Sequence, residues 1–143
     1  MNVPVELTDI EARRLTLFAR GLTERDVAKE EEVSLSAIKQ SMSNIREKLW
    51  AKTTIQAVAM GVMDSICSII SVTTDIDKIN LDDRQKECLD CLGQGMLQKQ
   101  ADAFLDMPIH EFKKRKSQII KMMWALNINH AIAIYMLLNS RDE

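Results

Sequence analysis

Residues 34–49 read SLSAIKQSMSNIREKL, and their pattern is the clearest sign of helical structure in the chain. Its apolar residues recur at steps of four, three and four, which lines them up as one buried stripe on an α-helix: Ile38, Met42, Ile45 and Leu49. Polar residues fill the positions between them, and Ser34 or Ser36 supplies an N-cap. The stretch therefore predicts an amphipathic helix with a polar outer face.

The residues before this stretch predict two shorter helices. Thr8 followed three residues later by Glu11 forms a capping box, and Gly21 ends the first helix. Thr23 caps a second helix, which runs from Glu24 to about Glu31. Two short helices joined by a tight turn, the second with a polar outer face, are typical of a helix-turn-helix.

The chain repeats itself at an offset of 74 residues without a gap. Trp50 aligns with Trp124, Gly21 aligns with Gly95, and many apolar positions coincide in the same register. Agreement of this kind indicates two copies of one small unit. We therefore expect an all-α fold of two tandem four-helix helix-turn-helix units: a first unit over 1–72, a linker over 73–80 and a second, divergent unit over 81–143.

The last helix of each unit is apolar on almost every side. These helices are expected over about Thr54–Ile70 and Asn129–Leu138, and helices without a polar face are normally buried on several sides. We expect them to pack on each other, either within one chain as a monomeric pseudo-dimer or across a homodimer. The residues expected in that contact are Ile55, Val58, Val62, Ile66, Ile132, Tyr135 and Met136.

Composition and charge exclude several other classes of protein. Aromatic residues make up 4% of the chain and there are only 4 Gly and 2 Pro, which argues against a turn-rich β-sandwich. An apolar fraction of 46% argues against disorder. A net charge of −2 excludes a uniformly basic nucleic-acid coat, although a local basic face remains compatible with it.

Targeting signals and metal sites are not expected. Residues 1–7 lack the basic and apolar regions of a signal peptide, and Asp64 interrupts the most apolar stretch, so we expect no membrane partner. The three cysteines, Cys67, Cys88 and Cys91, lack the spacing of a disulfide framework, which indicates a reducing cytoplasm. Cys88 and Cys91 form a C-x-x-C without partner ligands at zinc spacing, so we expect core thiols, no metal and no cofactor.

Residues 7–63 resemble the LuxR/GerE-type helix-turn-helix domain of bacterial transcription regulators. Residues 81–136 match the same pattern more weakly, and region four of sigma factors is the nearest look-alike. The positions that match the family motif in the first unit are Leu7, Thr8, Glu11, Leu15, Leu17, Ala19, Gly21, Thr23, Val27, Ala28, Ser34, Ile38, Lys39, Ile45, Lys48 and Leu49.

Two positions in each unit depart from the family pattern. The glycine of the turn is replaced by Glu32 and Asp106, although a backbone with positive φ disfavours Glu. The glycine after the third helix is replaced by Trp50 and Trp124, which we expect to be buried plugs of the core or of an interface. The acidic run at residues 30–32 is either a solvated helix end or a sign that the first unit binds DNA weakly.

The resemblance implies a DNA-binding transcription regulator that places one or both third helices in the major groove of double-stranded DNA. At the groove-facing positions it implies Lys39, Gln40 and Ser43 in the first unit and Lys113, Lys114 and Ser117 in the second. Next to them, the residues expected to reach the backbone or to add positive charge are Thr23, Arg46, Lys48, Arg115, Lys116 and Lys121.

An enzyme is not expected, because the sequence has no phosphate-binding glycine loop, nucleophile–base pair or metal cluster. The competing hypothesis is a protein-interaction module built on a DNA-binding fold, which would act as an antagonist or cofactor of another regulator or of RNA polymerase. Its support is the acidic run, the near-neutral charge and the apolar fourth helices. Ile120 at the position of Arg46, and Lys116 at that of Met42, also leave room for another role of the second unit.

Overall fold

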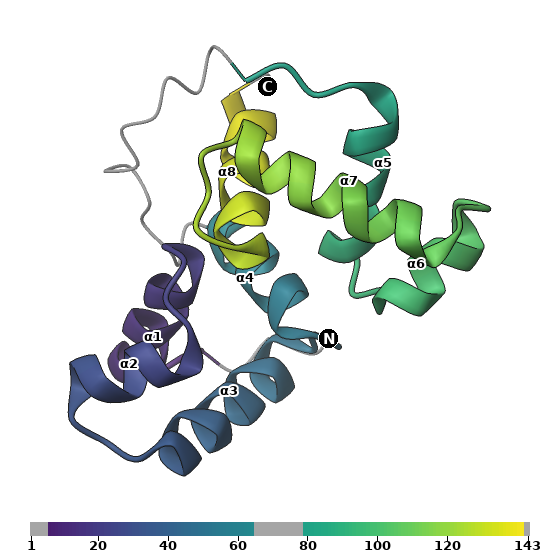
Figure 1. Cartoon of the computed structure of the whole chain (residues 1–143). Helices are drawn as coiled ribbons and strands as arrows, with labels where there is room; N and C mark the ends of the chain where they lie inside the picture. The colour runs from purple at the N-terminus through teal and green to yellow at the C-terminus, as the bar shows by residue number, and fades with distance from the viewer. Residues whose placement is uncertain (1–5, 65–78, 142–143) are drawn as a thin grey trace.

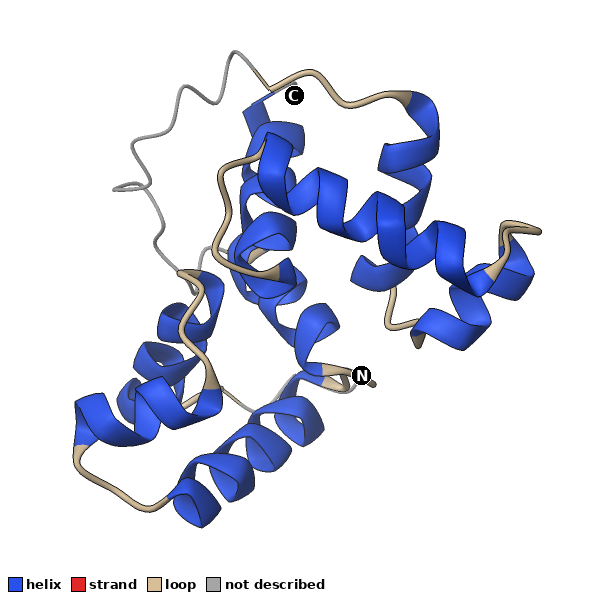
Figure 2. Cartoon of the chain, viewed as in Figure 1, coloured by secondary structure: helices blue, strands red, loops and turns tan. Residues whose placement is uncertain are grey.

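The computed structural model describes residues 6–64 and 79–141, and within these ranges the chain is helical without any strand (Figures 1 and 2). The prediction of an all-α fold is confirmed. The first four helices are α1 (Asp9–Ala19), α2 (Glu24–Glu31), α3 (Leu35–Leu49) and α4 (Thr54–Met63). The other four are α5 (Asp83–Gly93), α6 (Gln98–Phe104), α7 (Ile109–Met122) and α8 (Ile128–Arg141).

Equivalent helices start at a constant spacing along the chain. Each of α5, α6, α7 and α8 begins 74 residues after α1, α2, α3 and α4, respectively. The residues with positive φ pair at the same offset: Gly21 with Gly95, Glu32 with Asp106, and Trp50 with Trp124. These starts lie in the register that the sequence repeat predicts. The division into two units stays a prediction, because most of the expected linker lies outside the described residues.

Side-chain caps begin the helices of the first half. The Thr8 hydroxyl accepts a hydrogen bond from the backbone N–H of Glu11 (3.1 Å), and the Glu11 carboxylate accepts one from the N–H of Thr8 (2.9 Å). Thr23 and Asp26 form the same reciprocal box, and Ser34, not Ser36, caps α3. Each cap of this kind contributes about 1 kcal/mol. The helix starts therefore follow from local sequence.

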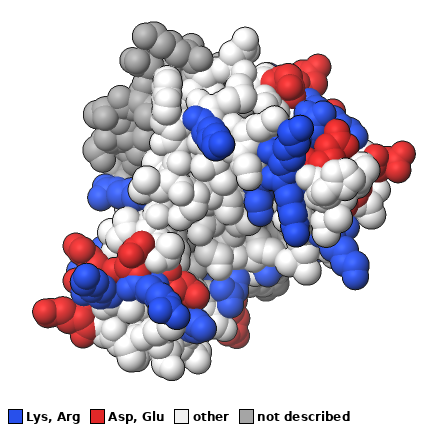
Figure 3. All heavy atoms as spheres, in the orientation of Figure 1, with Lys and Arg blue, Asp and Glu red and all other residues white. Residues whose placement is uncertain are grey.

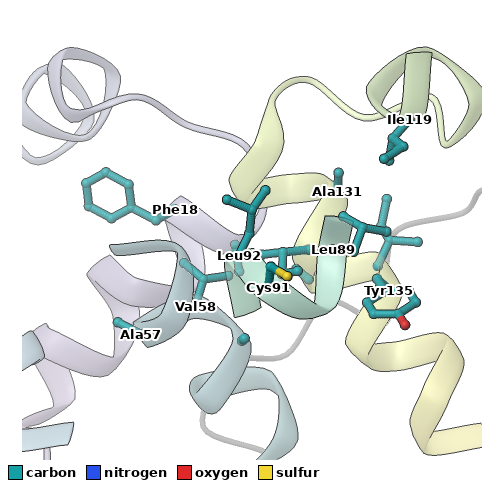
Figure 4. Close-up of a cluster of buried hydrophobic side chains, with 14 of the residues drawn as sticks. Phe18, Ala57, Val58, Leu89, Cys91, Leu92, Ile119, Ala131 and Tyr135 are labelled. Carbon is teal, nitrogen blue, oxygen red and sulfur yellow. The ribbon is translucent and has the colours of Figure 1, made fainter. Parts of the chain in front are cut away.

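One hydrophobic core joins the two halves of the chain. The most extensive helix–helix contact is between α4 and α8, and it is flanked by α1 against α8 and by α5 against α4. Figure 4 shows side chains from both halves in this cluster, among them Phe18, Val58, Leu92 and Ala131. The fourth helices thus pack on each other within one chain.

The boundaries of the apolar helices differ from the expected ones. Helix α4 ends at Met63 with Asp64 as its C-cap, whereas the sequence pattern predicted a helix to Ile70. Ile66, expected in the contact between fourth helices, lies outside the described residues. Helix α8 is longer than expected and runs from Ile128 to Arg141. None of the helices in the described ranges has the length and apolar character needed to cross a membrane.

The two tryptophans are not plugs of the core, so that part of the expectation is wrong, and their place in an interface stays a prediction. The exposed fraction is 69% for Trp50 and 59% for Trp124. Each follows the last turn of its helix in a left-handed conformation, with φ of 59° and 54°. Because these residues lie beyond the buried stripe of α3 and α7, their side chains project into solvent.

Candidate nucleic-acid interface

Helix α7 carries a basic outer face that the structure leaves accessible. Its inner side is held by Phe112, Ile119 and the following Met123, all at most 1% exposed. This packing turns the opposite side of the helix outward, and Lys and Arg side chains gather over α7 in Figure 3. The predicted DNA contacts exposed on this outer face are Lys113, Lys114, Ser117 and Lys121, and Gln118 is exposed beside them.

Two other cations of α7 are already engaged. An Arg115 guanidinium nitrogen lies 3.2 Å from a carboxylate oxygen of Glu111, one turn earlier. The half-buried Lys116 donates a hydrogen bond of 3.3 Å from Nζ to Oε1 of Gln98 on α6. Lys116 therefore joins α7 to α6, while the Arg115 pair stays within α7. Within the described part of the chain, Lys113, Lys114 and Lys121 form no ion pair, so their charges are available to a ligand.

Helix α3 presents a less charged outer face. Lys39, Gln40 and Ser43 are exposed, as the groove-facing role requires. The Gln40 side-chain amide donates a 3.0 Å hydrogen bond to Asn44 on the next turn. Arg46 donates one of 3.0 Å to the Thr54 hydroxyl at the start of α4. Arg46 thus ties α3 to α4.

Lys48 is bound inside its own unit. Its Nζ lies 2.6 Å from Oε1 of Glu11, a buried carboxylate on α1. Burial by itself would raise the pKa of Glu11, but hydrogen bonds from Lys48 and Thr8 hold that pKa below its usual value. The ion pair joins α3 to α1, so the positive charge of Lys48 is already compensated within the protein.

The acidic run next to α3 divides into one paired and two solvated residues. Glu31 accepts hydrogen bonds from Arg13 (2.6 Å) and Arg14 (2.7 Å) of α1, and these bonds lower its pKa. Glu30 and Glu32 are exposed, and acidic and basic side chains intermix over α2 in Figure 3. Arg13 and Arg14 therefore form ion pairs with Glu31, which compensates its negative charge.

The two halves meet at a pair of equivalent junctions. At one, Gly21 faces the start of α8, and a Cβ added to it would lie 2.9 Å from Cβ of Leu126. At the other, Gly95 faces the start of α4, and an added Cβ would lie 2.4 Å from Oε1 of Gln56. Since Gln56 and His130 are themselves 74 residues apart and each lies against one of the glycines, the two junctions are related in the same register as the helices.

Polar side chains complete these junctions, and sequence reasoning missed them. Asn127 donates a hydrogen bond of 2.8 Å to the carbonyl oxygen of Gly21. The backbone N–H of Leu126 donates to Nδ1 of His130 (3.0 Å), and burial lowers the pKa of His130, which favours the neutral imidazole that accepts this bond. The signal that could have found them is the pair of aligned glycines, because a glycine with positive φ permits a close approach.

The residues expected between the fourth helices lie in or against the common core. Val58, Ile132 and Tyr135 are buried, and Ile55, Val62 and Met136 are half-buried against the same cluster. The Tyr135 hydroxyl donates a hydrogen bond of 2.8 Å to Asp90 of α5, so Tyr135 also anchors α8 to its own half.

Cys88 and Cys91 are buried free thiols, as predicted. Burial raises the pKa of both, that of Cys88 to about 11, so neither is a thiolate at neutral pH. Among residues 6–64 and 79–141, no three His, Cys, Asp or Glu side chains are grouped so that they could hold a metal ion.

Comparisons with protein-family models, with curated proteins and with solved structures give no match for this chain. The similarity to LuxR/GerE-type domains therefore stays a prediction from the residues.

Proposed function

We propose that this protein is a transcription regulator that binds double-stranded DNA by placing at least one of two recognition helices, α3 and α7, in the major groove. The observation that carries the proposal is the outer face of α7. Lys113, Lys114 and Lys121 are exposed there and form no ion pair among the described residues, and the exposed Ser117 lies among them. Cations that reach phosphates supply affinity, and short polar side chains on the same face can reach base edges.

The packing of α4 on α8 supports a single-chain pseudo-dimer. One chain carries two helix-turn-helix pairs on one core, which is the arrangement that two-fold partners use to reach successive grooves. If both helices enter the DNA, the site is an imperfect inverted repeat, because the two outer faces differ in sequence; if only one enters, the site is a single half-site. Light scattering tests the oligomeric state: a species of 16.3 kDa supports the pseudo-dimer, and a stable species of twice that mass contradicts it.

Selection from a pool of random DNA duplexes tests the function. The proposal predicts enrichment of a common sequence, to which the protein binds about a thousandfold more tightly than to unselected DNA. Replacement of Ser117 by Ala should change the bases preferred at one position of the site, while Lys86→Ala, an exposed residue of α5 outside both recognition helices, should leave them unchanged. A pool without any enrichment over repeated rounds would contradict the proposal.

A second function, binding to RNA polymerase or to another regulator, is favoured by Trp50 and Trp124. Exposed aromatic residues are enriched in the binding hot spots of protein interfaces, and a bulky residue with positive φ is rare without a specific reason. The test is direct binding of purified RNA polymerase to the wild type and to the Trp50→Ala, Trp124→Ala double variant. This second function predicts that the wild type binds and that the double variant does not.

A further inference from the structure

We infer that the two helix-turn-helix pairs are unequal, and that the α6–α7 pair alone contacts the DNA phosphates while the α2–α3 pair does not. The inference rests on the proposed function and assigns its contacts to one of the two halves. It makes the protein a pseudo-dimer in structure with a single DNA-binding face.

Net charge separates the two pairs. Residues 24–49 contain five Lys or Arg and six Asp or Glu, a net charge of −1. Residues 98–122 contain six Lys or Arg and three Asp or Glu, a net charge of +3. Phosphate contacts dominate affinity for DNA, so this difference favours the α6–α7 pair.

The cations that remain unpaired are unequal as well. Of the three on α3, Lys48 is bound to Glu11 and Arg46 to Thr54, which leaves Lys39. On α7, three lysines without an ion pair remain after Arg115 and Lys116 have found partners inside the hairpin. A recognition helix with a single available cation is poorly suited to anchor a duplex.

The number of acidic residues at the turn before each recognition helix also differs between the two halves. In the first half it carries three consecutive glutamates at residues 30–32, and the exposed Glu30 and Glu32 would repel a phosphate backbone. At the equivalent positions of the second half stand Phe104, the buried Leu105 and Asp106, a single acid. The first pair therefore has two solvated acids at this turn, Glu30 and Glu32, where the second has one, Asp106.

The consequence for the DNA is a footprint on one side of the pseudo-dimer. The α6–α7 pair would occupy one major groove, and the α2–α3 pair would contribute the packing that holds α4 against α8 and α1. The bound sequence would then be a single half-site rather than an inverted repeat.

Paired substitutions at equivalent positions test this inference by fluorescence anisotropy on a labelled duplex of random sequence, with a salt titration. Lys113→Ala and Lys114→Ala should each weaken binding by about tenfold and reduce the magnitude of the salt slope by about one. Their matched controls, Lys39→Ala and Gln40→Ala, should stay within twofold of the wild type. All four side chains are exposed, and circular dichroism checks that the variants keep their helices.

Each outcome separates the inference from the proposed function. A loss confined to the α7 variants supports both. An equal loss for Lys39→Ala and Lys113→Ala would overturn the inequality and leave DNA binding standing. A wild-type protein that binds no duplex at low salt would overturn the proposed function and this inference with it.

Discussion

The side-chain amide of Asn127 lies 2.8 Å from the carbonyl oxygen of Gly21, to which it donates a hydrogen bond across 106 residues of sequence. The same side chain caps α8, since its Oδ1 accepts a 3.0 Å hydrogen bond from the N–H of His130. One residue thus starts a helix of the second half and binds the end of α1 in the first half. The junction depends on local and long-range bonds at the same time.

Replacement of Asn127 by Ala should lower the free energy of unfolding by about 2 kcal/mol, because it removes a helix cap and leaves the Gly21 carbonyl without this donor. The matched control is Thr53→Ala at the equivalent position, where the side chain caps α4 through Gln56 and only about 1 kcal/mol should be lost. Urea unfolding measures both. Equal losses would contradict a role of Asn127 across the junction.

Gly21→Ala should destabilise the protein more than Gly95→Ala does. Both residues have positive φ, 96° and 90°, so both substitutions strain the backbone. A Cβ at position 21 would lie 2.9 Å from Cβ of Leu126, which is fixed to the backbone, whereas at position 95 it would meet the movable end of Gln56. We expect losses of about 3 and about 2 kcal/mol, respectively, by urea unfolding. The reverse order would show that the starts of α4 and α8 are not packed as described.

Glu31→Gln should destabilise the protein by about 1 kcal/mol at pH 7 and by less at acidic pH. Arg14 and Arg13 hold the pKa of Glu31 below its ordinary value of 4.5. A lowered carboxylate pKa contributes stability that is complete above the unfolded pKa and is lost as the pH falls through the folded pKa. The difference between wild type and variant should therefore shrink below pH 4.5. Glu30→Gln, an exposed neighbour, is the control and should change stability at neither pH.

Asp102→Ala should stabilise the protein by about 1 kcal/mol. Asp102 is 9% exposed, and its Oδ1 is buried without a hydrogen-bond partner in the described structure. An unpaired buried carboxylate oxygen is costly to desolvate, and the equivalent residue of the first half is the buried Ala28. Thermal unfolding measures the change. A lower melting temperature for Asp102→Ala would show that this carboxylate has a stabilising partner.

Local chemistry explains why the helices could be predicted from the sequence. Thr8, Thr23 and Ser34 cap helices where their positions predict them, and the stripe from Ile38 to Leu49 is buried as its spacing predicts. These features depend on residues within a few positions of one another. The second set of helices also begins at the 74-residue offset that the sequence repeat predicts.

Long-range contacts explain what could not be predicted. The ion pair of Lys48 with Glu11 joins residues 37 positions apart, so the sequence alone left Lys48 among the candidates for DNA contact. Trp50 is exposed because it lies beyond the buried stripe of α3 in a left-handed conformation, whereas its large apolar area favours burial in a core. Contacts between residues far apart in the sequence decide which cations are without a partner. The spacing of residues along the sequence does not reveal such contacts.

The salt dependence of DNA affinity measures whether α7 binds DNA phosphates. If α7 binds phosphates, the logarithm of the association constant should fall linearly with the logarithm of salt concentration. The Lys113→Ala, Lys114→Ala, Lys121→Ala triple variant should reduce the magnitude of that slope by about three, while Lys86→Ala, an exposed lysine on α5, should not change it. A wild-type affinity that does not change with salt, or a triple variant with the salt slope of the wild type, would contradict the binding of DNA phosphates by α7.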